Sequence, residues 1–418
     1  MNEKLPFVFV IAFPVVLLVS GLMLEPLPVI GEGLLAIISA PSVLLTDYLA
    51  VGGVGATLVN AGILGIASVV LIYGCKAQIN GPFIAAVYTV VGFAFFGKNI
   101  YNVVPILVGA WLYSAHQGVQ YRNVLLIALF GTTLGPLVSF LTVATGLAPN
   151  VAITIAIMFG LLAGFVLPPL ASHMLRFHDG YNIYNVGFTG GITGAFFVAV
   201  FRSFDFEIGA TSVLTGEYHA FFMQFFVVMF LFLIALSVFM SRLDYGALFS
   251  ALRRIYASGG RLVSDFVQIG NFSGVIMNMG VMGLASILFV IILGGELNGP
   301  VIGGILTVVG FAAFGKHLFN CVPVMLGVVI ASLVTAWNTT TTPVVIAGLF
   351  GTTLAPVAGQ YGVVAGIAAG FFHLSIVMNV GILHGGVNLY NNGFAGGFVA
   401  SFLVPVLDAL RRPRSNRT

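Results

Sequence analysis

Two lysines stand at matched positions in otherwise apolar sequence. Lys98 follows Phe-Gly and precedes Asn102, and Lys316 follows Phe-Gly and precedes Asn320, with a proline three residues after each asparagine. An ammonium group inside a membrane is costly and is by default a functional candidate. The two lysines could attract an anion and the asparagines could hydrogen-bond to it. In the alternative interpretation, each lysine snorkels to an interface.

A second repeated block contains paired hydroxyl groups. Thr132 and Thr133 lie in Gly-Thr-Thr-Leu with a proline two residues later, and Thr352 and Thr353 lie in the same pattern. Glycine and proline can break a helix, and threonine hydroxyls can replace the lost hydrogen bonds or line a pore. A structural kink that packs against a neighbouring helix is the alternative.

A third repeated block precedes the last apolar segment of each half. An amide and a hydroxyl group at the start of a helix can cap it and can also bind a solute. A plain interfacial cap is the alternative. The candidate binding residues of this block are Asn182, Tyr184, Asn185, Asn388, Tyr390 and Asn391.

These blocks belong to an internal repeat that covers the chain. The Asn-Gly-Pro at Asn80 recurs at Asn298, 218 residues later, and the threonine and tyrosine blocks recur at offsets of 220 and 206. Ordered matches of this kind are the signature of a duplicated unit. We therefore predict two membrane repeats, residues 1–204 and residues 205–418.

The composition restricts the class of protein. The chain has 418 residues, of which 59% are hydrophobic and 6% charged, with a mean hydropathy of +1.12. Soluble proteins have about 25% charged residues. This excludes a soluble enzyme, a nucleic-acid binder and a disordered chain, and the small net charge of +3 indicates no nucleic-acid partner. The remaining class is a polytopic all-α membrane protein whose outer surface meets lipid.

Each half contains about seven apolar segments, several of them too short to span a bilayer alone. The third and fourth segments of each half could be half-helices or a re-entrant hairpin. The segments lie near 5–24, 54–74, 81–96, 103–115, 123–144, 150–175 and 186–202, and near 220–241, 272–294, 299–314, 321–336, 343–361, 362–383 and 393–408.

An odd number of crossings per half would insert the two halves with opposite orientations. With both termini in the cytoplasm, 13 of the 15 basic residues face inward, and Lys98 and Arg202 are the exceptions. This distribution follows the positive-inside rule. We therefore predict inverted-topology repeats with broken or re-entrant helices, in a multi-pass protein of the bacterial inner membrane.

The sequence lacks the motifs of most enzymes. It has no Walker motif, no Gly-x-Ser-x-Gly and no His/Cys set spaced for a metal. We therefore expect no metal, no cofactor and no enzymatic activity. Asp47 and Asp265 recur in amphipathic stretches, where we predict a cap or a charge partner at the surface. Asn60 and Asn278 are predicted to form interhelical hydrogen bonds.

The plan of two oppositely inserted halves resembles that of urea transporters and ammonium channels. The Tyr-Asn-x-Gly blocks at Tyr184 and Tyr390 look like the aromatic–Asn–Gly motif of urea transporters, whereas the lysine pair departs from that family. The chain as a whole resembles an uncharacterised family of bacterial inner-membrane proteins with an internal duplication, which implies a location and no substrate.

Inverted repeats with interrupted helices are typical of transporters, whose solute site lies at the repeat interface. We predict a permease or channel for a small polar solute, and we favour an anion such as a short carboxylate. A facilitator of a small neutral solute such as urea is the first alternative, and a membrane-embedded enzyme or assembly factor is the second. The expected partners are the solute and the bilayer, and a homo-oligomer is left open.

Overall fold

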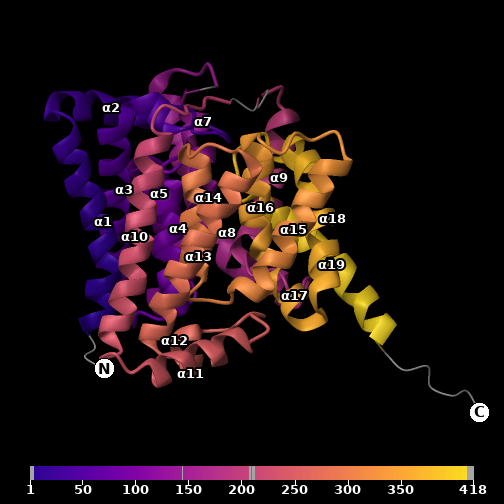
Figure 1. Cartoon of the computed structure of the whole chain (residues 1–418). Helices are drawn as coiled ribbons and strands as arrows, with labels where there is room; N and C mark the ends of the chain where they lie inside the picture. The colour runs from indigo at the N-terminus through magenta and orange to yellow at the C-terminus, as the bar shows by residue number, and fades with distance from the viewer. Residues whose placement is uncertain (1–3, 144, 207–208, 210–211, 412–418) are drawn as a thin grey trace, which may run out of the picture.

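The computed structural model describes residues 4–143, 145–206, 209 and 212–411, which form an all-α polytopic membrane protein (Figure 1). The α-helices are α1 (Lys4–Leu24), α2 (Leu27–Ser39), α3 (Tyr48–Gly74), α4 (Gly81–Phe93), α5 (Ile100–His116), α6 (Leu125–Gly131), α7 (Gly135–Val143), α8 (Pro149–Met174), α9 (Asn185–Arg202), α10 (His219–Met240), α11 (Tyr245–Tyr256), α12 (Phe266–Ile269), α13 (Phe272–Leu293), α14 (Gly299–Phe311), α15 (Leu318–Val334), α16 (Thr342–Gly351), α17 (Ala355–Tyr361), α18 (Val363–His384) and α19 (Asn391–Arg411). Three 3₁₀ turns are η1 (Tyr121–Asn123), η2 (Thr132–Leu134) and η3 (Thr352–Leu354).

Within these described residues, nine helical stretches are long and apolar enough to cross a membrane. Two of them are the composite rods α6–η2–α7 and α16–η3–α17. The predicted break at each Gly-Thr-Thr-Leu is confirmed, because the 3₁₀ turns interrupt both rods. The helix α1 begins and α19 ends at the lower side of the molecule in Figure 1, while α2 lies at the upper side and α11 at the lower.

Two helices were not expected from the apolar pattern. They are α2 and α11, which lie between the first and second predicted segments of each half. Both are short, and the second carries Arg253 and Arg254 in its last turn. The smaller offset of the third block fits the connections: five residues, 144–148, separate α7 from α8, whereas Gly362 alone separates α17 from α18.

The third and fourth segments form a hairpin rather than two packed spans. The rod α6–α7 is antiparallel to α5, because Gly131 lies against Ile106 and Gly135 against Asn102. Its start lies beside the start of α4, where Leu126 and Pro82 line one cavity. Helices α4 and α5 therefore run in opposite directions, and the turn that joins them is the tip of a hairpin.

The short helices α4 and α14 cross at the centre of the molecule. Every residue of both helices is buried. Gly92 near the end of α4 lies against Gly303 near the start of α14, and Gly310 lies against Ala85 in the converse contact. The two helices are therefore antiparallel, and the lysine that follows each helix lies at the opposite end of the pair.

Candidate functional site

The turn that carries each lysine is built by glycine and asparagine. Gly97 and Gly315 have φ of +98° and +97°, a left-handed conformation that other residues adopt only with strain. Asn60 on α3 donates from Nδ2 to the carbonyl groups of Ala94 (2.8 Å) and Lys98 (2.9 Å). The predicted interhelical role of Asn60 is confirmed. Its bonds tie the turn to the middle of α3.

The same construction recurs at the second turn. Asn278 on α13 donates from Nδ2 to Ala312 O and Lys316 O, both at 2.8 Å. Asn320 donates to Gly315 O (2.9 Å) and accepts from the amide of His317 (2.9 Å). The predicted hydrogen-bonding role of Asn278 is likewise confirmed.

Asn102 holds the first turn as its counterpart holds the second. It donates from Nδ2 to Gly97 O (2.9 Å) and Ser139 Oγ (3.0 Å), and its Oδ1 accepts from the amide of Asn99 (3.0 Å). Both amide ends of the side chain are thus engaged in the turn. We assign Asn102 and Asn320 a positioning role for the lysines.

Both lysines lie deep inside the protein. The side chains of Lys98 and Lys316 are 0% exposed. A snorkelling lysine keeps its ammonium group in water, so the snorkelling interpretation is wrong. At roughly 1.5 Å of rise per residue, Asn60 stands about 10 Å along α3 from the kink at Gly53 and about 21 Å from its last residue. The turn of Lys98 is therefore well within the length of that helix.

The two ammonium groups have different surroundings. Lys316 Nζ donates to the Tyr184 hydroxyl and to Thr352 Oγ1 (2.7 Å), and it stands 4.4 Å from the centre of the Tyr184 ring. Lys98 Nζ lies 5.0 Å from the centre of the Phe93 ring and has no hydrogen-bond partner among the described residues. Each lysine follows the C-terminal end of a helix, whose partial negative charge favours a cation.

The tyrosine hydroxyls account for this difference. Tyr184 reaches Lys316, whereas the Tyr390 hydroxyl is directed toward Thr89 and Thr307 at matched positions on α4 and α14. In the part of the chain that the structure describes, Tyr390 Oη and Thr89 Oγ1 form no hydrogen bond, although both are buried. The Thr307 hydroxyl donates to Gly303 O at 2.7 Å.

The second threonine of each pair joins the two halves. Thr353 Oγ1 donates to Asn182 Oδ1 (2.5 Å), and Thr133 Oγ1 donates to Asn388 Oδ1 (3.0 Å). The same amide oxygens accept from the backbone amides of the two candidate tyrosines at 3.2 Å each. These residues therefore place each tyrosine beside the broken rod of the other half. Thr132 Oγ1 donates to Leu129 O (2.6 Å), which fits the predicted structural alternative for that hydroxyl.

Two histidines that we had not singled out as binding residues complete the polar set. His178 Nε2 is 3.1 Å from Asn185 Oδ1, and Asn185 Nδ2 donates to Ala171 O (2.9 Å). At the matched positions of the other half, both nitrogens of His384 and Oδ1 of Asn391 have no partner among the described residues. His178 and His384 are separated by 206 residues, which is the offset of the tyrosine block, so the repeat could have identified both histidines.

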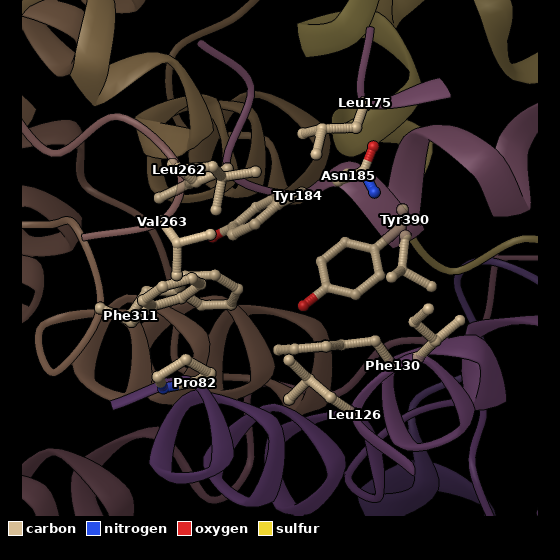
Figure 2. A pocket seen from close by; sticks show the side chains of 15 residues that line it. Pro82, Leu126, Phe130, Leu175, Tyr184, Asn185, Leu262, Val263, Phe311 and Tyr390 are labelled. Atoms are coloured by element: carbon tan, nitrogen blue, oxygen red, sulfur yellow. The ribbon is translucent and has the colours of Figure 1, made fainter. Parts of the chain in front are cut away.

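A cavity of about 170 Å³ lies between the two candidate tyrosines (Figure 2). Its walls are mainly apolar. In the close view, Phe311 lies on the side of Tyr184 and Phe130 lies on the side of Tyr390. The ring centres of the two tyrosines are 5.0 Å apart. Asn185 is half-buried and lines this cavity, whereas the other predicted site residues are buried. Neither lysine lines the cavity.

Two buried aspartates fix the starts of the central helices. Asp265 Oδ1 accepts from the amide of Gly81, the first residue of α4, at 3.1 Å. Asp47 is 0% exposed and Asp265 is 8% exposed. The predicted capping role is confirmed, since each also caps the helix that follows it, but the predicted surface location is wrong. The sequence could not show that these carboxylates face a helix of the other half.

The described residues contain no group of three or more His, Cys, Asp or Glu side chains that could hold a metal ion. The side chains at the site offer hydrogen bonding and charge from two ammonium groups, several hydroxyls and several amides. This set is rich in donors, and donors of this kind bind oxygen acceptors.

The chain matches one family profile, described as "Protein of unknown function (DUF1576)", over residues 28–203 and 245–409. No curated protein and no solved structure matches the chain. The similarity to urea transporters expected from the Tyr-Asn-x-Gly blocks is not shown by these comparisons.

Proposed function

The chain belongs to this family of unknown function, and from that premise we propose that it is a transport protein for a small anionic solute, with short carboxylates as the substrate class. The observation that carries the proposal is the pair of fully buried lysines whose observed partners are hydroxyl groups or none. A buried ammonium group without a counter-charge is costly, and a bound carboxylate would supply that charge.

The surroundings of the lysines support a solute with a small apolar body. The cavity beside Tyr184 is lined mainly by aromatic and aliphatic side chains and has a volume of about 170 Å³. A carboxylate could place its hydrocarbon part against these walls, and the lysines and the tyrosine hydroxyl groups would supply hydrogen-bond donors for its oxygens. An apolar pocket with a few convergent polar groups is typical of small-molecule sites.

The arrangement of the helices supports a transport role. We propose that residues 1–204 and 205–418 are inverted repeats, since α4 and α14 are antiparallel and each is followed by a lysine turn. In a bilayer the α4–α5 and α14–α15 hairpins would re-enter from opposite sides. We also propose that both termini lie in the cytoplasm of a bacterial cell and that the chain is a multi-pass protein of the inner membrane, on the basis of the positive-inside distribution of its basic residues.

Uptake into proteoliposomes tests the proposal. We expect the purified chain to take up radiolabelled acetate, propionate or lactate, and we expect Lys98→Gln or Lys316→Gln to abolish uptake. Lys76→Gln is the matched control, because Lys76 is an exposed lysine in the loop before α4 and should retain uptake.

Circular dichroism and size-exclusion chromatography should show that all variants remain folded. Normal uptake by the Lys98→Gln/Lys316→Gln double variant contradicts the lysine assignment. Failure of the parent chain to move any of the three carboxylates contradicts the substrate class.

A facilitator of a small neutral solute is the second candidate, and one observation favours it. The lysines do not line the cavity, whose polar side chains are Tyr184, Tyr390 and Asn185. This candidate predicts urea flux that is independent of membrane potential and unchanged in both lysine variants.

A further inference from the structure

Six pairs of polar residues at matched positions differ in hydrogen bonding. In every pair, the residue near Lys316 has fewer buried side-chain atoms without a partner among the described residues than the residue near Lys98. We call Lys316, Tyr184, Thr307, Asn182, Asn185 and His178 the Lys316 set, and their counterparts Lys98, Tyr390, Thr89, Asn388, Asn391 and His384 the Lys98 set. In the Lys316 set, Nδ1 of His178 has no partner among the described residues, and the polar side-chain groups of the other five residues are hydrogen-bonded. In the Lys98 set, every residue has a buried side-chain nitrogen or oxygen without a partner among the described residues.

The bonds that hold the two lysine turns do not show this difference, although Nδ1 of His317 and Oδ2 of Asp265 at the Lys316 end also have no partner among the described residues. The asparagines that hold the two lysine turns make the same bonds at nearly the same distances. The backbone bonds that place the tyrosines also match, since Ile183 N donates to Thr353 O and Leu389 N donates to Thr133 O, both at 3.1 Å. One repeated scaffold therefore carries two different states of the same polar set.

We propose that the protein has a second conformation in which the two sets exchange these states. In that conformation the Tyr390 hydroxyl accepts from Lys98, beside Thr132, and the Tyr184 hydroxyl turns to Thr89 and Thr307. The residues required for each bond already stand at matched positions of the repeat. Two conformations of equivalent bonding are expected to lie close in free energy, and a ligand can then shift their populations.

The exchange also indicates which lysine binds the carboxylate in each conformation. This part of the inference rests on the proposed function. A tyrosine hydroxyl oxygen beside the ammonium group occupies the position that a carboxylate oxygen would take. In the described conformation the Tyr184 hydroxyl takes that position at Lys316, whereas no hydroxyl takes it at Lys98. The carboxylate therefore binds to Lys98 in this state, and to Lys316 in the other.

The two ends of the α4–α14 pair also differ in exposure. Val263 lines the cavity and is 75% exposed, whereas Leu45, at the matched position 218 residues earlier, is 8% exposed. The segment that joins the halves covers Leu45, since Val213 N donates to Leu45 O at 3.0 Å. The exchange predicts that this segment moves away from Leu45, and that Leu45 becomes more exposed, when the tyrosines change partners.

Thiol labelling tests the exchange without any solute. Val263→Cys and Leu45→Cys are made separately in a chain whose native Cys75 and Cys321 are replaced by alanine, and reaction with a maleimide is followed in detergent. We expect rapid labelling of Val263→Cys and slow labelling of Leu45→Cys. Adding Tyr184→Phe removes a hydrogen bond to a charged group, which should raise the Leu45→Cys rate about tenfold or more, while the Val263→Cys rate serves as the exposed reference.

Tyr390→Phe is the matched control, because the Tyr390 hydroxyl makes no bond in the described conformation. We expect it to leave the Leu45→Cys rate unchanged or lower. If Cys321→Ala prevents folding, the buried Cys321 is retained and only Cys75 is replaced. Equal effects of Tyr184→Phe and Tyr390→Phe, or no effect of Tyr184→Phe, overturn the exchange even if carboxylate uptake is confirmed. Conversely, the expected labelling without carboxylate uptake keeps the exchange and contradicts the proposed function.

Discussion

The Lys316 end and the Lys98 end of the α4–α14 pair share one scaffold and differ in their polar contacts. At both ends a glycine with positive φ precedes the lysine, and an asparagine from a neighbouring helix holds the turn. At one end the lysine is bonded to a tyrosine and a threonine, and at the other it has no partner among the described residues. The backbone thus fixes where each lysine stands, while the tyrosines decide what it binds.

Replacing the asparagines that hold the lysine turns should lower the free energy of unfolding more than replacing the lysines or the histidines. The loss should be equal at both ends. Asn60→Leu and Asn278→Leu each leave two buried carbonyl groups without a donor. We expect each to lower the free energy of unfolding by about 2–4 kcal/mol, since an unsatisfied buried acceptor costs roughly 1–3 kcal/mol. Denaturant unfolding in detergent micelles, followed by circular dichroism, measures the change.

Asn379→Leu is the control for these variants. Asn379 is exposed and bonds only within its own helix, so its replacement should change the unfolding free energy little. The change caused by the control variant sets the threshold for this comparison. If the losses of unfolding free energy at Asn60 and Asn278 differ by more than that change, the two scaffolds are not equivalent.

Replacing the lysines should change the free energy of unfolding less than replacing these asparagines. The two ends should differ in the direction of the change. Lys316→Met removes the donor to Tyr184 and Thr352 and should lower the free energy of unfolding by about 1.5–3 kcal/mol, the range for hydrogen bonds of charged groups. Lys98→Met removes a buried group without a partner and should leave stability unchanged or raise it.

The same unfolding assay, carried out without added solute, measures both lysine variants. Lys76→Met again serves as the exposed control and should have little effect. A loss of stability at Lys98 as large as that at Lys316 would mean that Lys98 has a partner in solution, and the two ends would then be alike.

Much of the fold could be predicted from the sequence. Charge poverty and the apolar segments predicted a polytopic all-α membrane protein, and the glycine and proline pattern predicted the short helices and the broken rods. Helices α2 and α11 could not be found in this way. Helix α2 is apolar, but its 13 residues are too few for a membrane span. Helix α11 carries two arginines in its last turn, so its hydropathy signal is weak.

The candidate site could be predicted as a set of residues but not as a set of contacts. The repeat identified both lysines and both tyrosines, because matched polar residues in apolar sequence stand out. It could not show that the Tyr184 hydroxyl reaches Lys316 while the Tyr390 hydroxyl points elsewhere. Matched residues predict matched contacts, and the side-chain conformations of the two tyrosines differ. For the same reason, Asp47 and Asp265 were expected at the surface although they contact helices of the opposite half.

The histidines should give the smallest effect, again with a difference between the ends. His178→Leu breaks the contact with Asn185 and should lower the free energy of unfolding by about 0.5–1.5 kcal/mol, the usual net worth of a neutral hydrogen bond. His384→Leu breaks no hydrogen bond, because neither ring nitrogen has a partner among the described residues, and should be neutral or slightly stabilising. Paired denaturant curves of the two variants measure the difference. If His384→Leu is the more costly change, the polar set around Lys98 is bonded in solution, and the exchange between two states loses its structural basis.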